Sequence, residues 1–411
     1  MNISAERNKV LLNLSFFYAM FLFGINYGMV SPILIELSEK IGSPIAVMGN
    51  FFSMTAAGFI TGSILSSILS RFNIRKIVFL SFYILLPVSI IAIAFSYNYF
   101  FLLLSGFFMG ITNGLLESNI TVVLAETNKG REAQYINNSQ ALFGFGAFAG
   151  PMISTILVKS GISIRNAFIF IAVLCFLNLI FFLFLKIPSG FEHIKEGAST
   201  DKKSLKKDLL LKHKTNSNIF FRNMIIVAAL FLAMFAYGCS EGVINSWLPT
   251  YLRLEKNFSA LLSGNTISFF WLSVTIGRIV IGFFSRKIRS TYILFAITIM
   301  TIAAFKLGTY FSAPAAASAM ILITGFFLAG IWPLIVSLGV EFFPRQSSTF
   351  LPIVIMAGGA GTIFSPWLAG VIYANSNLSR AIDLIFLFII ILIAFFSFLL
   401  YSDIRYFKKK V

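Results

Sequence analysis

Two acidic residues lie deep inside apolar stretches of the chain, where a charge is costly. Glu117 is the only charged residue between positions 103 and 125, and Glu241 is the only one between positions 237 and 247. A carboxylate at the middle of a lipid bilayer costs about 2.5–3.5 kcal/mol on insertion scales, so by default it marks an ion or solute pathway. The two acids therefore indicate a membrane transporter that handles protons.

Each acid also has a structural explanation. Asn113 and Asn119 flank Glu117, and hydrogen bonds to their amides would make it a purely structural acid. For Glu241 the structural alternative is an ion pair with a Lys or Arg residue. We expect no basic residue at the depth of Glu241 on a cavity-lining helix. In the functional interpretation, each carboxyl binds and releases a proton as the pathway opens to alternate sides.

The composition excludes a soluble globular protein. The mean hydropathy is +0.89, with 58% hydrophobic and 11% charged residues. Apolar stretches long enough to cross ~30 Å of hydrocarbon recur along the chain. Because lipid offers no hydrogen-bond partners, these stretches must be helices, which predicts an all-α integral membrane protein. The twelve predicted spans are 12–36, 47–70, 77–97, 99–126, 133–158, 165–187, 222–252, 258–285, 291–311, 313–341, 347–375 and 379–401.

The net charge of +17 is distributed unevenly over the predicted loops. If the termini and the even-numbered loops share one side, that side carries all but seven of the 32 Lys and Arg residues. By the positive-inside rule, both termini are cytoplasmic. The charge therefore signals topology rather than nucleic-acid binding. We expect a multi-pass protein of a bacterial cytoplasmic membrane, in contact with the lipid bilayer and with no nucleic acid.

The sequence shows no pattern typical of a cofactor, a metal site or an enzyme. Cys175 and Cys239 fall within predicted spans without a pairing pattern, and His193 and His213 lie in the central polar segment. No nucleophile–base motif and no phosphate-binding loop is recognisable. We expect neither a cofactor nor a metal, and no enzymatic activity.

The chain repeats itself at a constant offset of 215 in residue number. Identical residues recur at this offset in three pairs of spans: Gly62 and Gly277, Arg71 and Arg286, Glu126 and Glu341, Pro151 and Pro366. One shared offset indicates an internal duplication. It predicts a six-helix bundle over 1–187, a polar cytoplasmic linker over 188–221 and a second six-helix bundle over 222–411. The Gly-rich stretches of spans five and eleven are expected to serve close helix packing.

Two six-helix bundles joined by a basic loop resemble the major facilitator superfamily. The resemblance implies that solute binds at the midplane between two rocking bundles, and that spans one, four, seven and ten line the cavity. Glu117 on span four and Glu241 on span seven both fall on such spans. By the offset of the repeat, Glu117 corresponds to Trp332 of span ten, and Glu241 corresponds to Asn26 of span one.

Charged residues near the cytoplasmic ends of the helices are candidates for a gate. They are Arg71, Glu126, Arg278, Arg286 and Glu341, with Arg278 one or two turns inside span eight. Arg71 and Arg286 begin segments that resemble degraded copies of the superfamily's loop 2–3 motif. Ion pairs among these residues would hold one face closed and break as it opens. The alternative is that they mark only topology and helix ends.

Four segments support a nearer resemblance. They read NGLLESNITVV, SQALFGFGAF, YGCSEGVINSWLP and SFFWLSVTIGRIVIGFFSRK, and they are similar to the fucose–galactose–glucose:proton symporter family, most of all to its bacterial glucose/mannose type. The resemblance implies proton coupling and sugar binding at Glu117, a matching amide at Gln140 and a second acid at Glu241. Fucose-type members carry an Asp on span one, where this chain has Asn26.

The sequence therefore predicts a monomeric secondary transporter that couples a proton to a hexose or a related small polar solute. Proton coupling is assigned to the two deep acids. Solute binding is assigned to Asn26, Glu117, Asn119, Gln140, Glu241, Asn245 and Trp332. The alternative is an exporter of a drug, a siderophore or a lipid-like cargo on the same architecture. Amides beside carboxylates favour a sugar, whereas a purely apolar cavity would favour an amphiphile.

Overall fold

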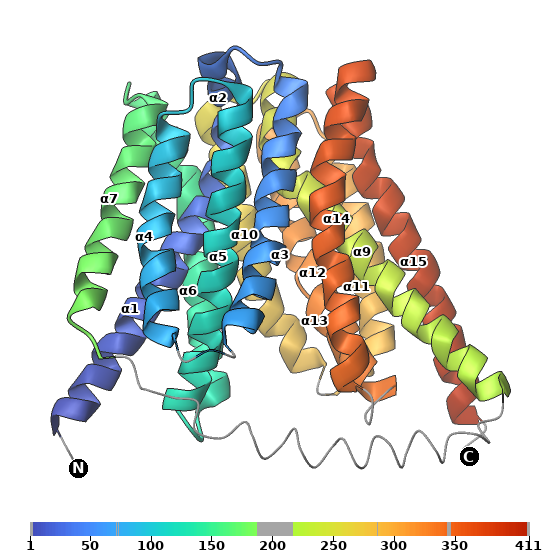
Figure 1. Cartoon of the computed structure of the whole chain (residues 1–411). Coiled ribbons are helices and arrows are strands. Elements are labelled where there is room, and N and C mark those ends of the chain that lie inside the picture. The colour runs from blue at the N-terminus through green and yellow to red at the C-terminus, as the bar shows by residue number, and fades with distance from the viewer. Residues whose placement is uncertain are drawn as a thin grey trace.

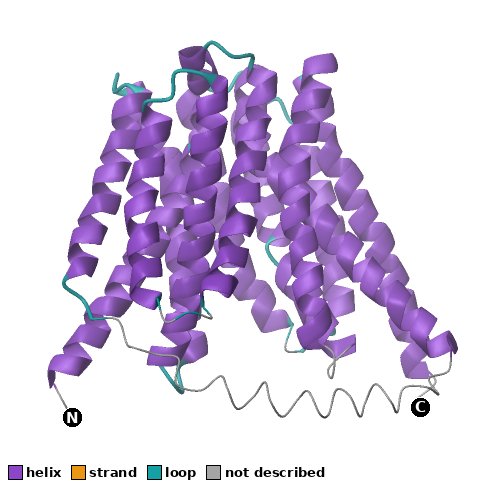
Figure 2. Ribbon diagram, viewed as in Figure 1, coloured by secondary structure: helices purple, strands orange, loops and turns teal. Residues whose placement is uncertain are grey.

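The structure, a computed structural model, describes residues 3–70, 72, 74–186, 217–285, 287–342 and 347–408. The regular elements within these residues are all helices (Figure 2). The first part of the chain forms α1 (Ile3–Met29), η1 (Ser31–Ile33), α2 (Leu34–Ile41), η2 (Ile45–Met48), α3 (Gly49–Leu69), α4 (Arg75–Ala94), α5 (Tyr99–Thr127), α6 (Glu132–Lys159) and α7 (Ile164–Leu183).

The second part of the chain begins at Ser217. It forms α9 (Ser217–Leu254), α10 (Ala260–Phe284), α11 (Ser290–Tyr310), α12 (Pro314–Leu328), α13 (Ile331–Phe342), α14 (Ser347–Asn375) and α15 (Leu378–Lys408). The predicted linker over 188–221 lies outside the described residues as far as position 216, and α9 already begins within its last residues. Arg71 and Arg286 also lie outside the described residues.

Twelve stretches of the described helices are long and apolar enough to cross a membrane, which confirms the predicted number. Helix α1 begins at Ile3 rather than near residue 12, because helical hydrogen bonding continues beyond the apolar run that the prediction follows. The tenth span, predicted as one helix, is interrupted between Leu328 and Ile331. Pro333 lacks the N–H that would bond to the Ala329 carbonyl, so the helix breaks there.

The helices form two groups, α1–α7 and α9–α15, which lie side by side (Figure 1). Matching pairs pack within each group, α1 against α6 and α9 against α14. The internal repeat relates Gly146 of α6 to Gly361 of α14. An added Cβ at either glycine would overlap a backbone carbonyl of the partner helix, that of Phe21 or Phe235. This confirms the predicted packing role of the Gly-rich stretches.

The two groups are joined at one end of the molecule. We call the end at which α7 ends and α9 begins the linker side, and the opposite end the far side (Figure 1). On the far side, a guanidinium nitrogen of Arg253 lies 2.7 Å from a carboxylate oxygen of Glu36, and Arg253 also donates to the Pro32 carbonyl at 3.2 Å. Gly49 of α3 packs there on the Pro366 carbonyl of α14.

Two pairs of helices cross between the groups, α3 with α14 and α6 with α10, and we call their joint interface the seam. An added Cβ at Gly144 would lie 2.6 Å from Thr275 Oγ1, and one at Gly359 would lie 2.7 Å from Ile60 Cδ1. Gly144 matches Gly359 by the offset of the repeat, and Ile60 matches Thr275, so the repeat relates these two contacts. From the seam towards the linker side, the ribbons of the two groups diverge (Figure 1).

Candidate functional site

Glu117 makes its described hydrogen bond to a neighbouring helix of its own group. Gln140 Nε2 of α6 donates to Glu117 Oε1 of α5 at 3.0 Å, and both side chains are half-buried. The packing of α5 on α3 fixes the position of Glu117 between the two ends of the molecule. An added Cβ at Gly110 or Gly114 of α5 would overlap a backbone carbonyl of α3. The two polar residues that the sequence pairs by resemblance are thus in direct contact.

Glu241 is connected to a tyrosine and an arginine of the second group. Tyr237 lies one turn before Glu241 on α9, so the two share a helix face. The Tyr237 side chain interacts with the Glu241 carboxylate and with the Arg278 guanidinium of α10. A hydroxyl can donate to the first and accept from the second, so Tyr237 is placed to bridge an acid and a base.

Arg278 also links the two groups electrostatically, because it acts on Glu117 as well as on Glu241. We expect no basic residue at the depth of Glu241 on a cavity-lining helix, and Arg278 instead extends its long side chain from α10, a helix outside the four expected to line the cavity. We call Glu117, Gln140, Tyr237, Glu241 and Arg278 the central polar cluster.

Two aromatic residues, one from each group, adjoin this cluster. Tyr27 of α1 interacts electrostatically with Glu241 and Arg278. Its ring meets Trp271 of α10 edge-on, with 5.3 Å between ring centroids and 77° between ring planes. Trp271 precedes Arg278 by two helical turns, on the far-side part of α10. The cluster is therefore bounded towards the far side by an aromatic contact between the groups.

Two buried asparagines flank the acids on the same helix faces. Asn113 lies one turn from Glu117, and Asn245 lies one turn from Glu241, each in the direction of the far side. They are 3% and 6% exposed, and the side-chain oxygen of each has no hydrogen-bond partner. Buried polar groups are normally paired, so these two amides require a partner that the protein itself does not supply.

Asn26 and Asn119, both assigned to solute binding from the sequence, lie elsewhere. Asn26 is 2% exposed and lies against the Cys175 thiol of α7, while its neighbour Tyr27 adjoins the cluster. Asn119 Nδ2 donates to Ser66 Oγ at 2.9 Å and to the Leu115 carbonyl at 2.8 Å. Neither asparagine has a described bond to the central polar cluster.

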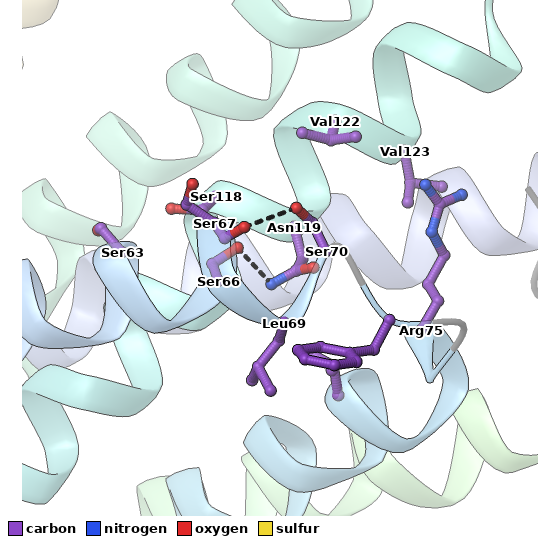
Figure 3. A pocket seen from close by; sticks show the side chains of 12 residues that line it. Ser63, Ser66, Ser67, Leu69, Ser70, Arg75, Ser118, Asn119, Val122 and Val123 are labelled. Carbon is purple, nitrogen blue, oxygen red and sulfur yellow. Dashed lines mark hydrogen bonds between the residues drawn. The ribbon is translucent and has the colours of Figure 1, made fainter. Parts of the chain in front are cut away.

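Asn119 instead lines a separate pocket of about 350 Å³ between the linker-side parts of α3, α4 and α5 (Figure 3). Five serines line it, Ser63, Ser66, Ser67, Ser70 and Ser118. The dashed line from Asn119 in Figure 3 is its hydrogen bond to Ser66, and Ser70 donates to the Ser67 carbonyl. None of the buried unpaired atoms among the described residues lies in this pocket.

Trp332, predicted as an aromatic platform, follows the break in the tenth span. It is the second residue of α13, and its side chain is 38% exposed. Trp271 is 4% exposed and is the tryptophan that contacts Tyr27 beside the cluster. The spacing of Trp271 and Arg278 by two helical turns is the sequence signal that places both on one face.

Two of the five predicted gate residues, Glu126 and Glu341, form repeat-related contacts near the linker side. In the first group, Arg75 forms a two-bond ion pair with Glu126, at 2.6 and 2.9 Å. In the second, Glu341 accepts from the hydroxyls of Ser290 at 2.8 Å and Ser337 at 3.2 Å. Ser290 is the repeat counterpart of Arg75, so a serine stands where the first group has an arginine. Each of these two contacts lies within a single group of helices, one in each group, and Arg278 takes part in neither.

No group of three or more His, Cys, Asp or Glu side chains that could hold a metal ion occurs in the part of the chain that the structure describes. The arrangement can instead bind and release protons at two carboxyls that share one guanidinium. It can also offer amide, hydroxyl and indole groups to a small polar ligand. These are the chemical capacities that the comparisons with known proteins must match.

A family model described as Major Facilitator Superfamily matches residues 16–352. Among curated proteins, the chain is 25% identical to the glucose/mannose transporter GlcP of Bacillus subtilis (strain 168) over 377 residues, covering 89% of this chain and 88% of the relative. It is 24% identical over 353 residues to a TsgA homolog of Yersinia pestis (strain Pestoides F), covering 85% of this chain and 84% of that protein.

Two solved structures show the same fold. A D-xylose-proton symporter matches with a TM-score of 0.79 and 16% identity, covering 95% of this chain and 96% of that one. A mutant form of the nucleoside transporter NupG matches with a TM-score of 0.75 and 14% identity, covering 95% and 98%. The likeness therefore extends over both groups of helices.

Proposed function

Because the chain belongs to the Major Facilitator Superfamily, we propose that it is a proton-coupled symporter of a hexose or a closely related neutral solute. The superfamily, the twelve spans and the sugar-transporter relatives make it a multi-pass membrane transporter and not an enzyme. Its two groups of helices act as the two rocking bundles, and its linker side is cytoplasmic under the positive-inside rule.

The observation that carries the proposal is the shared guanidinium between two acids. With both Glu117 and Glu241 ionised, Arg278 leaves the central polar cluster with one net negative charge. Binding one proton makes the cluster neutral. A net charge enclosed between the bundles is costly, so the neutral, protonated cluster is the form that closes around a solute.

Glu117 is the better proton carrier of the two acids. Its hydrogen-bond partner is the neutral amide of Gln140, whereas Glu241 is connected through Tyr237 to the fixed positive charge of Arg278. A nearby positive charge stabilises a carboxylate, and an amide donor does so less. Glu241 therefore keeps its charge while Glu117 gains and loses a proton.

The groups around the acids suit a neutral polyhydroxyl compound. Asn113 and Asn245 each present an unpaired amide oxygen, which can accept a hydrogen bond from a solute hydroxyl. Tyr27 adds an aromatic surface beside the acids. The names of two similar proteins, a glucose/mannose transporter and a D-xylose-proton symporter, support the same class of solute.

The test is an uptake assay in proteoliposomes with labelled hexoses, with and without an imposed pH gradient. We expect the wild type to accumulate hexose when the outside is acidic. Glu117→Gln should keep exchange of hexose across the membrane but lose accumulation, with a concentration ratio of about 1, because a proton no longer moves with the solute.

The matched control is Glu39→Gln, which removes an exposed carboxylate at the far side without touching the cluster. It should accumulate hexose as the wild type does. Full accumulation by Glu117→Gln would contradict the proton role. Export of a lipophilic cation in place of hexose uptake would support the exporter interpretation instead.

A further inference from the structure

The seam between the groups is built from two helix faces that the internal repeat relates. The face of α3 that meets the second group carries Gly49, Ser53, Ala56 and Ile60. The corresponding face of α10 carries their repeat counterparts, which in the same order are Gly264, Ser268, Trp271 and Thr275. None of these eight residues is charged. Two pairs are identical, Ile60 and Thr275 are both β-branched, and the largest difference is the indole of Trp271 where the first group has the methyl group of Ala56.

Polar atoms are buried in this seam without partners. The hydroxyls of Ser53 and Ser268 are repeat-related, 8% and 0% exposed, and neither has a hydrogen-bond partner. The indole Nε1 of Trp271, 4% exposed, has none either. An unpaired buried polar group is costly, so a second conformation in which these atoms are paired would relieve the same cost at matching positions of both groups.

That second conformation is the one in which the far side opens. Ser53 and Ser268 lie in the far-side half of their helices, and Trp271 lies at the middle of α10. When the bundles separate there, these atoms become accessible to whatever enters from outside. Trp271 contacts Tyr27, which in turn interacts with Glu241 and Arg278, so the opened seam leads directly to the central polar cluster.

We propose that Trp271 is a solute-binding residue of the outward-open state, and that its indole N–H donates a hydrogen bond to one hydroxyl of an entering neutral polyol. The chemistry of the face supports this class of ligand. None of the residues that carry its hydroxyls and its indole N–H is charged, which suits an uncharged solute, and the indole ring offers an apolar surface to a sugar ring. The inference rests on the proposed function and adds to it the residue that the solute meets first.

Trp271→Phe tests the proposal, because it removes the N–H and keeps an aromatic ring. Uptake of a labelled hexose should be measured from the far side in right-side-out vesicles and from the linker side in inverted vesicles. We expect the far-side KM to rise about 3- to 10-fold, which is the value of one neutral hydrogen bond, and the linker-side KM to stay unchanged. Trp367→Phe, at a tryptophan of α14 that is 45% exposed, is the matched control and should change neither constant.

Monodeoxy analogues of the hexose identify the bond itself. In the wild type, one analogue should bind about 3- to 10-fold more weakly than the parent sugar from the far side, because it lacks the hydroxyl that Trp271 contacts. Trp271→Phe should bind that analogue and the parent sugar equally. A merely structural role of Trp271 would weaken all analogues alike and leave the discrimination intact.

The outcomes separate the two proposals. If the wild type accumulates no hexose, the proposed function fails and this inference falls with it. If the wild type accumulates hexose but Trp271→Phe keeps full discrimination among the analogues, only the assignment of Trp271 is overturned. An equal rise of KM on both sides of the membrane also overturns it, because it would reflect a general distortion of α10.

Discussion

The two groups of helices share a scaffold and differ in chemistry. Glycine contacts recur at the offset of the repeat within each group and across the seam, as for Gly146 with Gly361 and Gly144 with Gly359. The side chains of the central polar cluster do not recur. Glu117 has Trp332 as its counterpart, and Tyr237 has Leu22. Duplication thus preserves the glycines that let helices approach closely, whereas the groups that we propose bind protons and solute differ between the halves.

The largest expected effect comes from removing the charge that the two groups share. Arg278→Gln leaves Glu117 and Glu241 without their common guanidinium. Removing one partner of a buried charged set is strongly unfavourable, so we expect hexose uptake to fall at least about 100-fold. Initial uptake rates in proteoliposomes, corrected for the amount of protein reconstituted, measure it.

The double variant Arg278→Gln/Glu241→Gln restores the charge balance by removing one acid with the base. It should recover part of the lost uptake, since Glu117 again has a single proton to carry. Glu117→Gln in place of Glu241→Gln should not recover proton-driven accumulation. Recovery by both double variants alike would show that the two groups do not divide the roles as proposed.

A second test concerns the glycines of the seam, where the two groups are most alike. Gly144→Val and Gly359→Val each place side-chain atoms against the opposite group, on Thr275 and Ile60 respectively. Both should weaken the closed far side and lower the uptake rate by about 10-fold, since crowding of a packed interface costs about 1–3 kcal/mol. Gly282→Val, at a glycine with open space around it, is the control and should transport normally.

The repeat explains how much of this architecture can be predicted from the sequence. The count of spans and the close packing of the Gly-rich stretches follow from hydropathy and spacing, which are local signals. The family resemblance singled out Gln140 and Glu117 separately, but not their contact. The position of the Arg278 guanidinium beside the two acids could not be predicted, because the reach of a long side chain from α10 depends on how the two groups are docked.

The differences between the residues assigned from the sequence and those of the central polar cluster have a similar physical origin. Asn26 and Tyr27 are adjacent, yet one helix position turns the side chain by about 100°, and the tyrosine rather than the asparagine adjoins the cluster. The break of the tenth span at Pro333 is visible in the sequence as a proline in the middle of an apolar run. The difference between Trp271 and its repeat counterpart Ala56 gains meaning only once both residues are known to lie in the seam.

A third prediction concerns the ion pair that joins the groups on the far side. Arg253 and Glu36 are partly exposed, at 18% and 20%, so their attraction is moderated by solvent. Arg253→Gln should shift the equilibrium towards the outward-open state by only about 3-fold. The labelling rate of Ser268→Cys by a membrane-impermeant thiol reagent, in a background with Cys175 and Cys239 replaced by Ser, reports that shift.

Glu36→Gln is the partner test of the same ion pair. It should accelerate labelling as much as Arg253→Gln does, and the double variant should add little, because both changes remove one interaction. A labelling rate that stays at the wild-type value in all three variants would show that the ion pair does not hold the far side closed.

The smallest expected effect compares Glu126 with Glu341, two acids at matching positions with different partners. Glu126→Gln breaks the two-bond ion pair with Arg75 and should lower the free energy of unfolding by about 1 kcal/mol. In Glu341→Gln the amide oxygen still accepts from Ser290 and Ser337, so the change should stay within about 0.5 kcal/mol. Thermal unfolding in detergent should therefore show a lower midpoint for Glu126→Gln alone. Equal losses would mean that the second group compensates for its missing arginine by another route, and that the two halves are more alike at the linker side than their described contacts indicate.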